Sequence, residues 1–533
     1  MVISDRGIVA TSQTLASQAG AQVLARGGSA MDAAIAANAT LGVVEPESCG
    51  LGGDLFAIYW EAKTGQLTAI NASGWAPSGL SIDVLKSMGH TAMPQEGIQS
   101  VTVPGCVDGW AKLHQRFGRL PWKDLFQPAI YYADHGYPVT EIIHEAWHSE
   151  EAKLAKDENA RRIFLRDGRS PQLGERWRDP QMAAAFKLIA AEGPAAFYRG
   201  AIAKAILRTS ERLGGKMTAA DLSEFESEWV QPISTEYRGW KVYELPPNGQ
   251  GIAAIEMLNI LSLFPLSTYA SRGVEELHTQ IEAQKLAYAD LHRYVADPRF
   301  SQVPVAGMLS MAYARERAAL IDRAKARCEA PPGNPAAIHG DTIYLSVVDG
   351  DGNIVSLIQS LYQHFGSGVV VDDYGFALQD RGGLFEMDAH HPNALAPRKR
   401  PFHTIIPAFM EKGNVHIGFG IMGGLNQAQA HTQFVSNVAD HGMNIQSALE
   451  APRFTKKTFG GCDVLIENRI PPAIRDALTA QGHKLQVVGD FSNEMGGGQA
   501  VIHDSASRIN YGASDPRKDG AAVPEPHPYF EKP

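Results

Sequence analysis

The feature that most constrains this chain is the change from a helical to a strand pattern at residue 342. The runs 342–349 and 354–361 are apolar and flank the turn-forming segment 350–353, which predicts a β-hairpin. Just before the hairpin, the proline-rich segment 331–335 ends the preceding pattern and predicts an exposed, mobile connection. Thr342 is therefore expected to be the first residue of a strand, at a place where the chain can be cut.

A cut between Asp341 and Thr342 would give Thr342 a particular chemistry. The freed α-amine has a pKa near ~7.7, so at neutral pH it can act as base toward the hydroxyl of the same residue. One residue then supplies both nucleophile and base. Taken alone, an Asp-Thr pair before a strand is more often ordinary strand sequence, so the rest of the chain has to decide.

The remainder of the chain mixes helices and strands without a linker or an internal repeat. Strand patterns predict a hairpin over 55–72 and strands at 403–410 and 414–419. Together the two kinds of pattern predict one α+β domain. Helical spacing predicts helices at 13–26, 29–42, through most of 121–213, and at 275–295, 314–328, 427–441 and 444–450.

The charge of the chain argues against nucleic acid and membrane surfaces as partners. The formal net charge is −10 and no basic block occurs, which favours a small molecule as partner. No stretch reaches the ~18 apolar residues of a membrane span, and the N-terminus lacks the apolar core of a secretion signal. We therefore expect a cytoplasmic protein.

The four cysteines, Cys49, Cys106, Cys328 and Cys462, are widely spaced and match no metal-binding pattern. We expect them to be reduced packing residues. The chemistry expected of Thr342 needs neither a metal nor a cofactor.

Several motifs follow one another along nearly the full length of the chain. They are Gly27-Gly28-Ser29-Ala30-Met31-Asp32-Ala33-Ala34, Val103-Pro104-Gly105, Tyr237-Arg238-Gly239, Lys285-Leu286-Ala287-Tyr288-Ala289-Asp290, Ser346-Val347-Val348-Asp349, Gly423-Gly424, Ala451-Pro452-Arg453-Phe454 and Tyr511-Gly512-Ala513-Ser514-Asp515-Pro516-Arg517. With these motifs the chain resembles the γ-glutamyltransferase family of N-terminal-nucleophile hydrolases. The resemblance implies a four-layer αββα sandwich, in which two β-sheets lie between helical layers.

The resemblance also implies a precursor that cleaves itself into a large fragment, 1–341, and a small fragment, 342–533. The two fragments would stay together as one intertwined domain, and we leave open whether two such heterodimers associate.

The resemblance further assigns roles to four residues. Thr342 would be the nucleophile, and Ser360 stands where the family has a second threonine that positions it. Gly423 and Gly424 match the glycine pair whose amides form the oxyanion hole, where one donor is worth roughly 3 kcal/mol. The alternatives are a solvent-facing strand serine for Ser360 and an ordinary turn for the glycine pair.

The residues that would hold the ammonium of a γ-glutamyl group are replaced. Arg381 and Leu384 stand at the positions of the family's glutamine and aspartate. An arginine repels an ammonium, whereas its planar fork suits a carboxylate. We therefore expect an anionic substrate; the alternative is a structural ion pair of Arg381 with Asp372, Asp373 or Asp380.

The side that would hold the γ-glutamyl carboxylate is altered as well. Ile82 replaces a clamping arginine, Tyr362 replaces an asparagine, and His403 and Thr404 replace two serines. Tyr362 would narrow the pocket, and His403 would either complete a carboxylate site or satisfy backbone groups. These replacements favour a short acid amide over a peptide-like γ-glutamyl donor.

The sequence thus predicts an amidohydrolase that acts on a small acidic amide through a threonyl ester. The leading candidate is oxamate, which would give oxalate and ammonia, as in ureide catabolism. γ-Glutamyl hydrolysis or transfer with glutathione-type substrates is an alternative. Cephalosporin-acylase-like activity is another, since relatives without the glutamyl site share the Gln-x-Arg-Gly pattern around Arg381. A non-catalytic member that binds a ligand is the alternative of another class.

Overall fold

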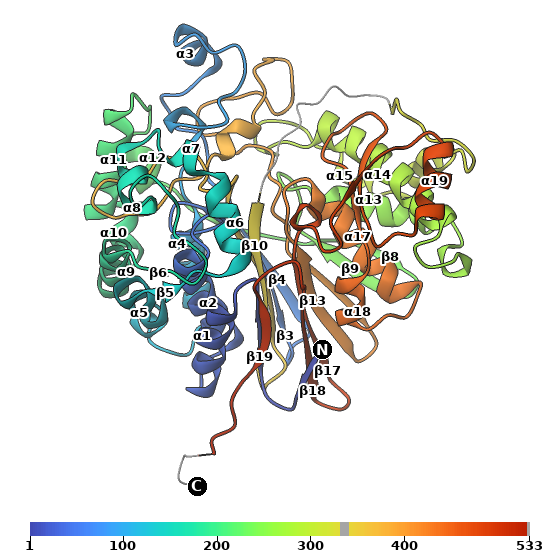
Figure 1. The fold of residues 1–533 in the computed structure, drawn as a ribbon, viewed down its shortest axis with the longest axis horizontal. Coiled ribbons are helices and arrows are strands. Elements are labelled where there is room, and N and C mark those ends of the chain that lie inside the picture. Colours follow the sequence, from blue (N-terminus) through green and yellow to red (C-terminus); the bar gives the residue numbers. More distant parts are fainter. Residues whose placement is uncertain (331–340, 530–533) are drawn as a thin grey trace.

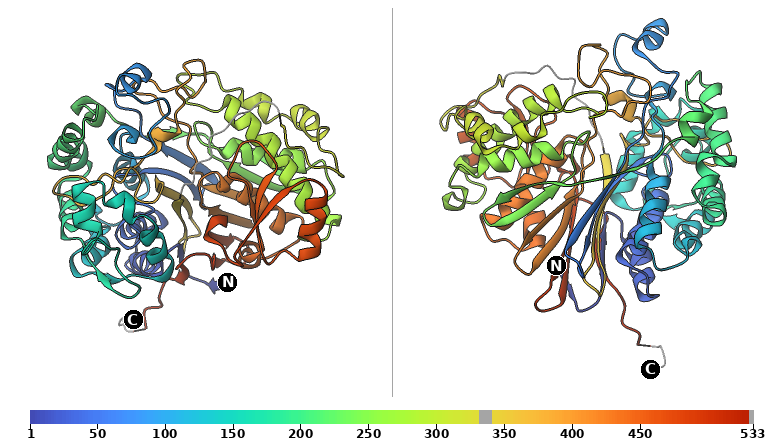
Figure 2. Two further views of the ribbon diagram at one scale, coloured as in Figure 1. Left: turned by 45° about the horizontal axis from the view of Figure 1, so that its top comes forward. Right: turned by 180° about the vertical axis from the view of Figure 1, so that it is seen from behind.

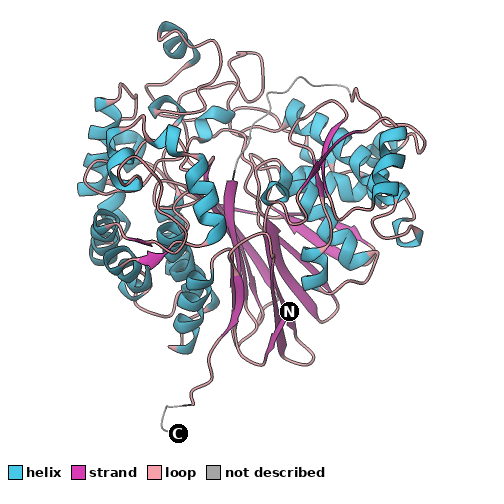
Figure 3. Cartoon of the chain, in the orientation of Figure 1, coloured by secondary structure: helices cyan, strands magenta, loops and turns pink. Residues whose placement is uncertain are grey.

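The computed structural model describes residues 1–330 and 341–529, and for Asp341 and Thr342 the backbone only. Two seven-stranded antiparallel sheets pack face to face, and helices cover the outer face of each (Figure 1). The views from above and behind in Figure 2 and the colouring in Figure 3 show the same order of layers. The predicted αββα sandwich is confirmed. The connection predicted at 331–335 lies outside the described residues.

The first sheet carries the predicted hairpin at its centre. The hairpin over 55–72 is also confirmed, as β3 and β4, which pair antiparallel next to it. The central strand of the sheet, β11, is buried along its whole length. The strands lie in the order β19 (Ala521–Pro524), β2 (Ile8–Thr11), β10 (Asp341–Val348), β11 (Ile354–Tyr362), β3 (Asp54–Glu61), β4 (Gln66–Ala72) and β7 (Glu228–Val230).

The second sheet faces the first through a layer of apolar side chains. Phe56 and Tyr344 from the first sheet and Phe409 and Val501 from the second belong to this layer. Each sheet therefore closes one side of a shared core, as in other face-to-face sheet pairs. The strands lie in the order β1 (Val2–Ser4), β18 (Ile509–Ser514), β17 (Gly498–Asp504), β13 (Val415–Ile421), β12 (Ala408–Lys412), β9 (Trp240–Glu244) and β8 (Ile233–Tyr237).

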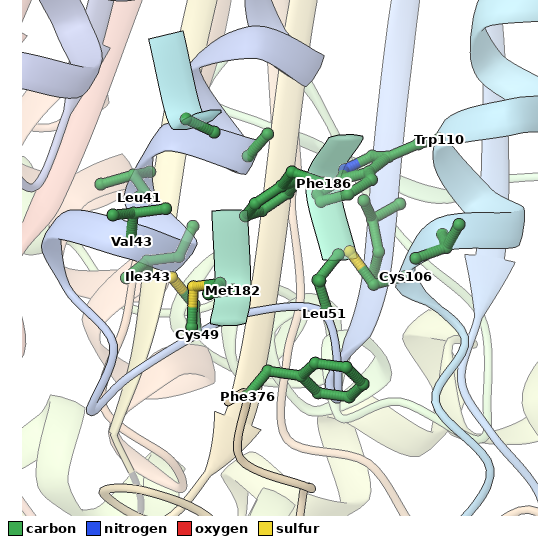
Figure 4. Close-up of a cluster of buried hydrophobic side chains, with 14 of the residues drawn as sticks. Leu41, Val43, Cys49, Leu51, Cys106, Trp110, Met182, Phe186, Ile343 and Phe376 are labelled. Atoms are coloured by element: carbon green, nitrogen blue, oxygen red, sulfur yellow. The ribbon is translucent and has the colours of Figure 1, made fainter. Parts of the chain in front are cut away.

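Helices from the first part of the chain cover the first sheet (Figure 1). The helices predicted at 13–26 and 29–42 are confirmed, and Ser29 caps the second of them in a reciprocal box with Asp32. Leu41, Val43 and Ile343 belong to the core beneath these helices (Figure 4). The helices are α1 (Thr14–Ala25), α2 (Ala30–Val44), α4 (Cys106–Phe117), α5 (Gln127–His135), α6 (Glu141–Ser149), α7 (Glu151–Leu154), α8 (Glu158–Phe164), α9 (Pro180–Glu192), α10 (Pro194–Tyr198), α11 (Ala201–Arg212) and α12 (Ala219–Ser223), with α3 (Ile82–Ser87) set apart at one end.

Helices from the later part of the chain cover the second sheet (Figure 1). The helices predicted at 275–295, 427–441 and 444–450 are confirmed to within a few residues. No helix in the described ranges is both long and apolar enough to cross a bilayer. The helices are α13 (Gly251–Leu261), α14 (Val274–Tyr294), α15 (Val305–Met308), α16 (Met311–Ala318), α17 (Asn426–Ala439), α18 (Ile445–Glu450) and α19 (Pro472–Ala480); two small sheets add β14 (Phe454–Thr455), β15 (Asp463–Glu467), β16 (Lys484–Val488), β5 (Tyr137–Pro138) and β6 (Arg176–Trp177).

Two predicted elements are shorter than expected. The helix predicted over 314–328 ends at Ala318, and further along the chain Ala326 donates to the carbonyl of Gln481 at 2.7 Å instead of continuing a helix. The strand predicted over 403–410 begins only at Ala408, because Pro407 before it has no N–H to give to a ladder.

The prediction that all four cysteines are reduced is wrong for one pair. Cys328 and Cys462 form a disulfide, whereas Cys49 and Cys106 are buried free thiols as expected. The bonded residues are 134 positions apart, and only the tertiary fold brings their Cα atoms within 4.6 Å. No local pattern in the sequence could indicate such a pair.

Candidate active site

The open end of the β10–β11 hairpin brings the predicted nucleophile position beside Ser360. The register of the two strands slips by one residue between Asp341 and Ile343. Two residues of β11, Ser360 and Leu361, therefore lie opposite Thr342, which is the geometry of a β-bulge. Bulges of this kind re-aim side chains and are frequent next to active sites.

The Ser360 side chain is held by the backbone that follows it. Ser360 is fully buried, and its hydroxyl accepts a hydrogen bond from the N–H of Tyr362 at 2.7 Å. Tyr362 itself has a φ of +85°, which a bulky residue rarely adopts and which is typical of functional sites. The hydroxyl thus sits inside the protein, in a local turn, and does not face solvent.

Gly423 and Gly424 form the turn between β13 and α17. Their φ angles are +121° and +59°, a region that favours glycine. Within the described ranges neither amide N–H is a donor in a hydrogen bond. The Gln250 side chain holds the turn by donating through Nε2 to the Gly424 carbonyl at 2.8 Å and to the Thr404 carbonyl at 2.5 Å. The turn is therefore fixed while both amides stay available to a ligand.

Arg381 opens a short 3₁₀ helix, Arg381–Leu384, and its side chain is completely buried. Its Nη1 donates to Thr404 Oγ1 at 2.5 Å, and its guanidinium carbon lies 4.6 Å from the centroid of the Tyr362 ring. Its Nε and Nη2 have no hydrogen-bond partner in the part of the chain that the structure describes. Burial lowers the pKa of Arg381 to about 10, so the side chain still carries its charge at neutral pH.

Asp372 and Asp373, two of the aspartates considered as ion-pair partners of Arg381, pair with other arginines instead. Asp372 accepts from Arg212 at 3.0 Å, and Asp373 accepts from Arg208 at 2.7 Å. Two free donors on a buried guanidinium form an edge that matches the two oxygens of a carboxylate. An edge of this kind can bind a carboxylate.

Two buried carboxylates balance the charge near Arg381. The carboxylate of Asp54 raises the pKa of Arg381, and it also accepts from His403 Nε2 and from Gln379 Nε2, each at 2.8 Å. Asp380 accepts from the N–H of Gln363 at 3.1 Å, and burial raises its pKa to about 7.

His403 is bound within this cluster and is neutral. Burial and the charge of Arg381 lower the pKa of His403 to about 4. With Nε2–H donating to Asp54, its Nδ1 accepts from the N–H of Ile405 at 3.4 Å. His403 thus orients Asp54 and brings no positive charge to the site at neutral pH.

Tyr362 and Leu384 line a cavity of about 260 Å³ beside these groups. Leu425, the residue after Gly424, borders the same cavity. The cavity is therefore adjacent to both the end of β11 and the glycine turn. Its remaining lining residues are Thr91, Ala92, Met93, Gln95, Leu291, His292, Val295, Gly383, Phe385, Glu386, Met387, Asp388, His391, Asn393, Phe402 and Phe459.

Within the described ranges, two groups of side chains lie close enough together to hold a metal ion. They are His278, Glu282 and His483, and His292, Glu386 and His391. In the first group Glu282 already accepts from the ammonium of Lys285 at 2.6 Å. In the second, Nδ1 of His391 accepts the N–H of Asn393 at 3.1 Å, while its Nε2 has no hydrogen-bond partner among the described residues.

The structure brings most of the predicted substrate residues together. Arg381 contacts Tyr362 and Thr404 directly, and Leu384 packs in the same apolar cluster as Tyr362. His403 precedes Thr404 in the chain, and its side chain bonds to Asp54. The predicted replacement of the clamping arginine, Ile82, begins α3 and packs in a separate small core with Leu80 and Leu85.

Sequence reasoning missed Asp54 and Gln250. Asp54 follows the run Gly50-Leu51-Gly52-Gly53 at the start of a strand, and a charged residue at the edge of a glycine-rich run was the signal that could have found it. Gln250 had no signal, because its role depends on two carbonyls more than 150 positions away.

Comparisons with known proteins agree with these observations. A family model for gamma-glutamyltranspeptidase matches residues 16–525. The glutathione hydrolase-like YwrD proenzyme of Bacillus subtilis is 38% identical over 98% of this chain and 99% of that protein. The oxamate amidohydrolase proenzyme of Klebsiella pneumoniae is 34% identical over 98% of this chain and 99% of that protein.

The crystal structure of cephalosporin acylase from Bacillus halodurans has the same fold, with a TM-score of 0.92 and 42% identity over 98% of this chain and 96% of that one. Hydrolases and acylases of this group act on amide carbon–nitrogen bonds, and their proenzymes imply a processed two-chain form in the family. The chain is accordingly an enzyme of the N-terminal-nucleophile hydrolase type, and it belongs to the γ-glutamyltranspeptidase family.

Proposed function

We propose that this chain cleaves itself between Asp341 and Thr342 and then hydrolyses the amide of a small anionic substrate, with oxamate as the leading candidate. The observation that carries the proposal is the Nε–Nη2 edge of Arg381, which is buried, charged and without a partner in the described ranges. A buried charged donor left unpaired costs free energy, so its presence favours a site that a carboxylate completes.

In the proposed reaction, the carboxylate of the substrate binds the free edge of Arg381, while Thr404 fixes the other end of the guanidinium. Thr342 Oγ attacks the amide carbonyl carbon, and its proton passes to the α-amine of the same residue. The amides of Gly423 and Gly424 stabilise the developing oxyanion. Ser360 positions the nucleophile from the opposite strand of the bulge.

Collapse of the tetrahedral intermediate breaks the carbon–nitrogen bond, and the α-ammonium returns its proton to the departing amine. Water then attacks the threonyl ester, again with the α-amine as base, and releases the acid. For oxamate the products are ammonia and oxalate. The fragments 1–341 and 342–533 stay together throughout as a heterodimer.

Two alternatives rest on relatives of similar or greater identity. The B. subtilis relative is named as glutathione hydrolase-like, and the B. halodurans structure is that of a cephalosporin acylase. Arg381 disfavours a γ-glutamyl substrate, because its positive charge would lie near the substrate ammonium and repel it. A cephalosporin-type amide with an acidic acyl group would use the same carboxylate receptor as oxamate.

The test compares ammonia release from oxamate with release of the aniline from a γ-glutamyl anilide and of the amine from a glutaryl anilide. Preference for oxamate or the glutaryl compound over the γ-glutamyl compound supports the proposal. Preference for the γ-glutamyl anilide contradicts the role proposed for Arg381. A processed protein that turns over none of them would favour the non-catalytic alternative.

A cytoplasmic location stays a prediction, and Cys328–Cys462 gives it a direct test. Disulfides are rare in reducing compartments and common in oxidising ones. If the protein isolated from its native cell carries this bond before any exposure to air, the predicted location is wrong.

A further inference from the structure

The cavity beside Tyr362 is larger and more apolar than the proposed smallest substrate requires. It measures about 260 Å³, and a two-carbon acid amide offers it no apolar group to bury. Tyr362 and Leu384 form one of its walls, and Leu425 connects it to the glycine turn. A substrate whose carbonyl lies at that turn would therefore extend a further substituent into the cavity.

Aromatic rings besides Tyr362 form part of the cavity lining. The ring of Phe459 stacks on that of His292, with centroids 4.9 Å apart, and meets that of Phe402 at 6.5 Å. Leu291 and Val295, from the end of α14 and just after it, also line the cavity. Flat aromatic groups of a ligand pack well in such surroundings, because offset and edge-on ring contacts add to the burial of apolar area.

The charged side chains of the lining disfavour a second anion. Among the described residues, the lining contains Glu386 and Asp388 and no lysine or arginine. The cations nearby lie outside it. Arg381 contacts the ring of Tyr362 from beyond the cavity. Burial lowers the pKa of His391, and Arg293 and Lys399 are close enough to lower it further. The cavity lining itself is therefore acidic.

From this arrangement we infer that the cavity binds the amine portion of the substrate, and that this portion is aromatic and either uncharged or cationic. The inference rests on the proposed function, because the carboxylate of the acyl part is placed at Arg381. In an oxamate the carbonyl carbon separates the carboxylate from the nitrogen, so a substituent on nitrogen points away from Arg381. The natural substrate class is then an N-arylalkyl amide of a short dicarboxylic acid.

The reaction remains a hydrolysis. Water supplies the hydroxyl of the released acid and a proton to the released amine, and the new carboxyl group then gives its own proton to that amine, so an N-benzyl oxamate gives oxalate and benzylammonium. Glu386 and Asp388 favour that cationic product over an anionic one, and Phe459 and His292 contact its ring.

The experiment measures kcat/KM for oxamate and for three N-benzyl oxamates that carry hydrogen, aminomethyl or carboxylate at the para position. We expect N-benzyl oxamate to exceed oxamate at least about tenfold, since burying a phenyl group is worth more than the 1.4 kcal/mol that this ratio represents. We expect the aminomethyl compound to exceed the carboxylate compound by about tenfold or more. Phe459→Ala should lower kcat/KM far more for N-benzyl oxamate than for oxamate, and so remove the advantage of the benzyl group.

Two further variants sharpen the test. Glu386→Gln should reduce the ratio of kcat/KM for the aminomethyl compound to that for the carboxylate compound. It should not change the ratio of kcat/KM for N-benzyl oxamate to that for oxamate. Phe491→Ala, at an exposed phenylalanine outside the cavity, is the matched control and should change neither. Equal turnover of oxamate and N-benzyl oxamate, or equal loss of both in Phe459→Ala, would overturn the inference. So would a preference for the carboxylate compound.

Calorimetry on the processed protein can measure the binding of benzylamine. This measurement separates the present inference from the proposed function. Saturable binding that Phe459→Ala abolishes supports the cavity assignment even if none of the amides is cleaved, in which case the proposed function alone fails. Turnover of oxamate together with no binding of benzylamine leaves the proposed function standing and overturns the cavity assignment.

Discussion

The guanidinium of Arg381 lies against the ring of Tyr362, with 4.6 Å between its central carbon and the ring centroid. This contact covers one face of the cation, and within the described ranges its Nε and Nη2 have no hydrogen-bond partner. A cation stacked on an aromatic ring keeps its in-plane donors for hydrogen bonds. The ring of Tyr362 thus orients the guanidinium from one face.

Removing the fork of Arg381 should weaken binding of an anionic amide. A charge-assisted hydrogen bond is worth about 1.5–3 kcal/mol, so Arg381→Gln should raise KM for oxamate about 10- to 150-fold. Arg381→Lys keeps the charge without the planar fork, so its KM for oxamate should lie between those of the wild type and of Arg381→Gln. Arg208→Gln, at an exposed arginine paired with Asp373, is the control. An unchanged KM in Arg381→Gln would show that this arginine is structural.

Anion binding should weaken as pH rises through about 7. Burial raises the pKa of Asp380 to about 7, so below that pH its carboxyl is neutral and above it a negative charge lies beside Arg381. The dissociation constant of oxalate, the unreactive product, should therefore rise from pH 6 to pH 8. Asp380→Asn should flatten this profile. A wild-type profile that falls over the same range would contradict the assignment.

Thr342→Ala should abolish processing. Denaturing electrophoresis under reducing conditions, with intact-mass measurement, should show one chain of 57.6 kDa for the variant and two fragments for the wild type. Thr342→Ser retains a hydroxyl and should be processed, although more slowly. A wild-type protein that remains a single chain after long incubation would contradict the proposed self-cleavage.

The disulfide should join the two fragments after cleavage, because Cys328 lies before the proposed cleavage site and Cys462 after it. Without reductant the processed wild type should migrate as one species, and with reductant as two. Cys462→Ser should give two species under both conditions, while Cys49→Ser, at a buried free thiol, should behave like the wild type. Separation of wild-type fragments without reductant would mean that the bond is not formed.

Elements defined by local signals were predictable from the sequence. The helices predicted at 13–26 and 29–42 and the turn between β10 and β11 depend on residues within a few positions of one another, and all of them are present in the structure. The early end of α16 was not predictable, since the chain after it makes contacts that only the tertiary fold supplies, such as the hydrogen bond from Ala326 to the carbonyl of Gln481.

The same difference between local sequence signals and contacts of the tertiary fold applies to the candidate site. Arg381 could be singled out because its charge conflicts with a substrate ammonium. The features that make it a receptor could not be read from the sequence, since Asp54, Thr404 and Tyr362 come from different elements. A sequence pattern names such a side chain, whereas its free donors become visible only once every neighbour has been placed.

Both sheets contain strands from each of the two proposed fragments, and this affects how the processed protein can dissociate. Strand β2 lies between β10 and β19, and β1 and β9 pair with β18 and β12, so each fragment supplies neighbours to the other in both sheets. Even with the disulfide reduced, the fragments cannot part without opening both ladders and the core between them. Dissociation is then the same event as denaturation, and the melting temperature of the mature protein should vary little with dilution over any practical time of measurement.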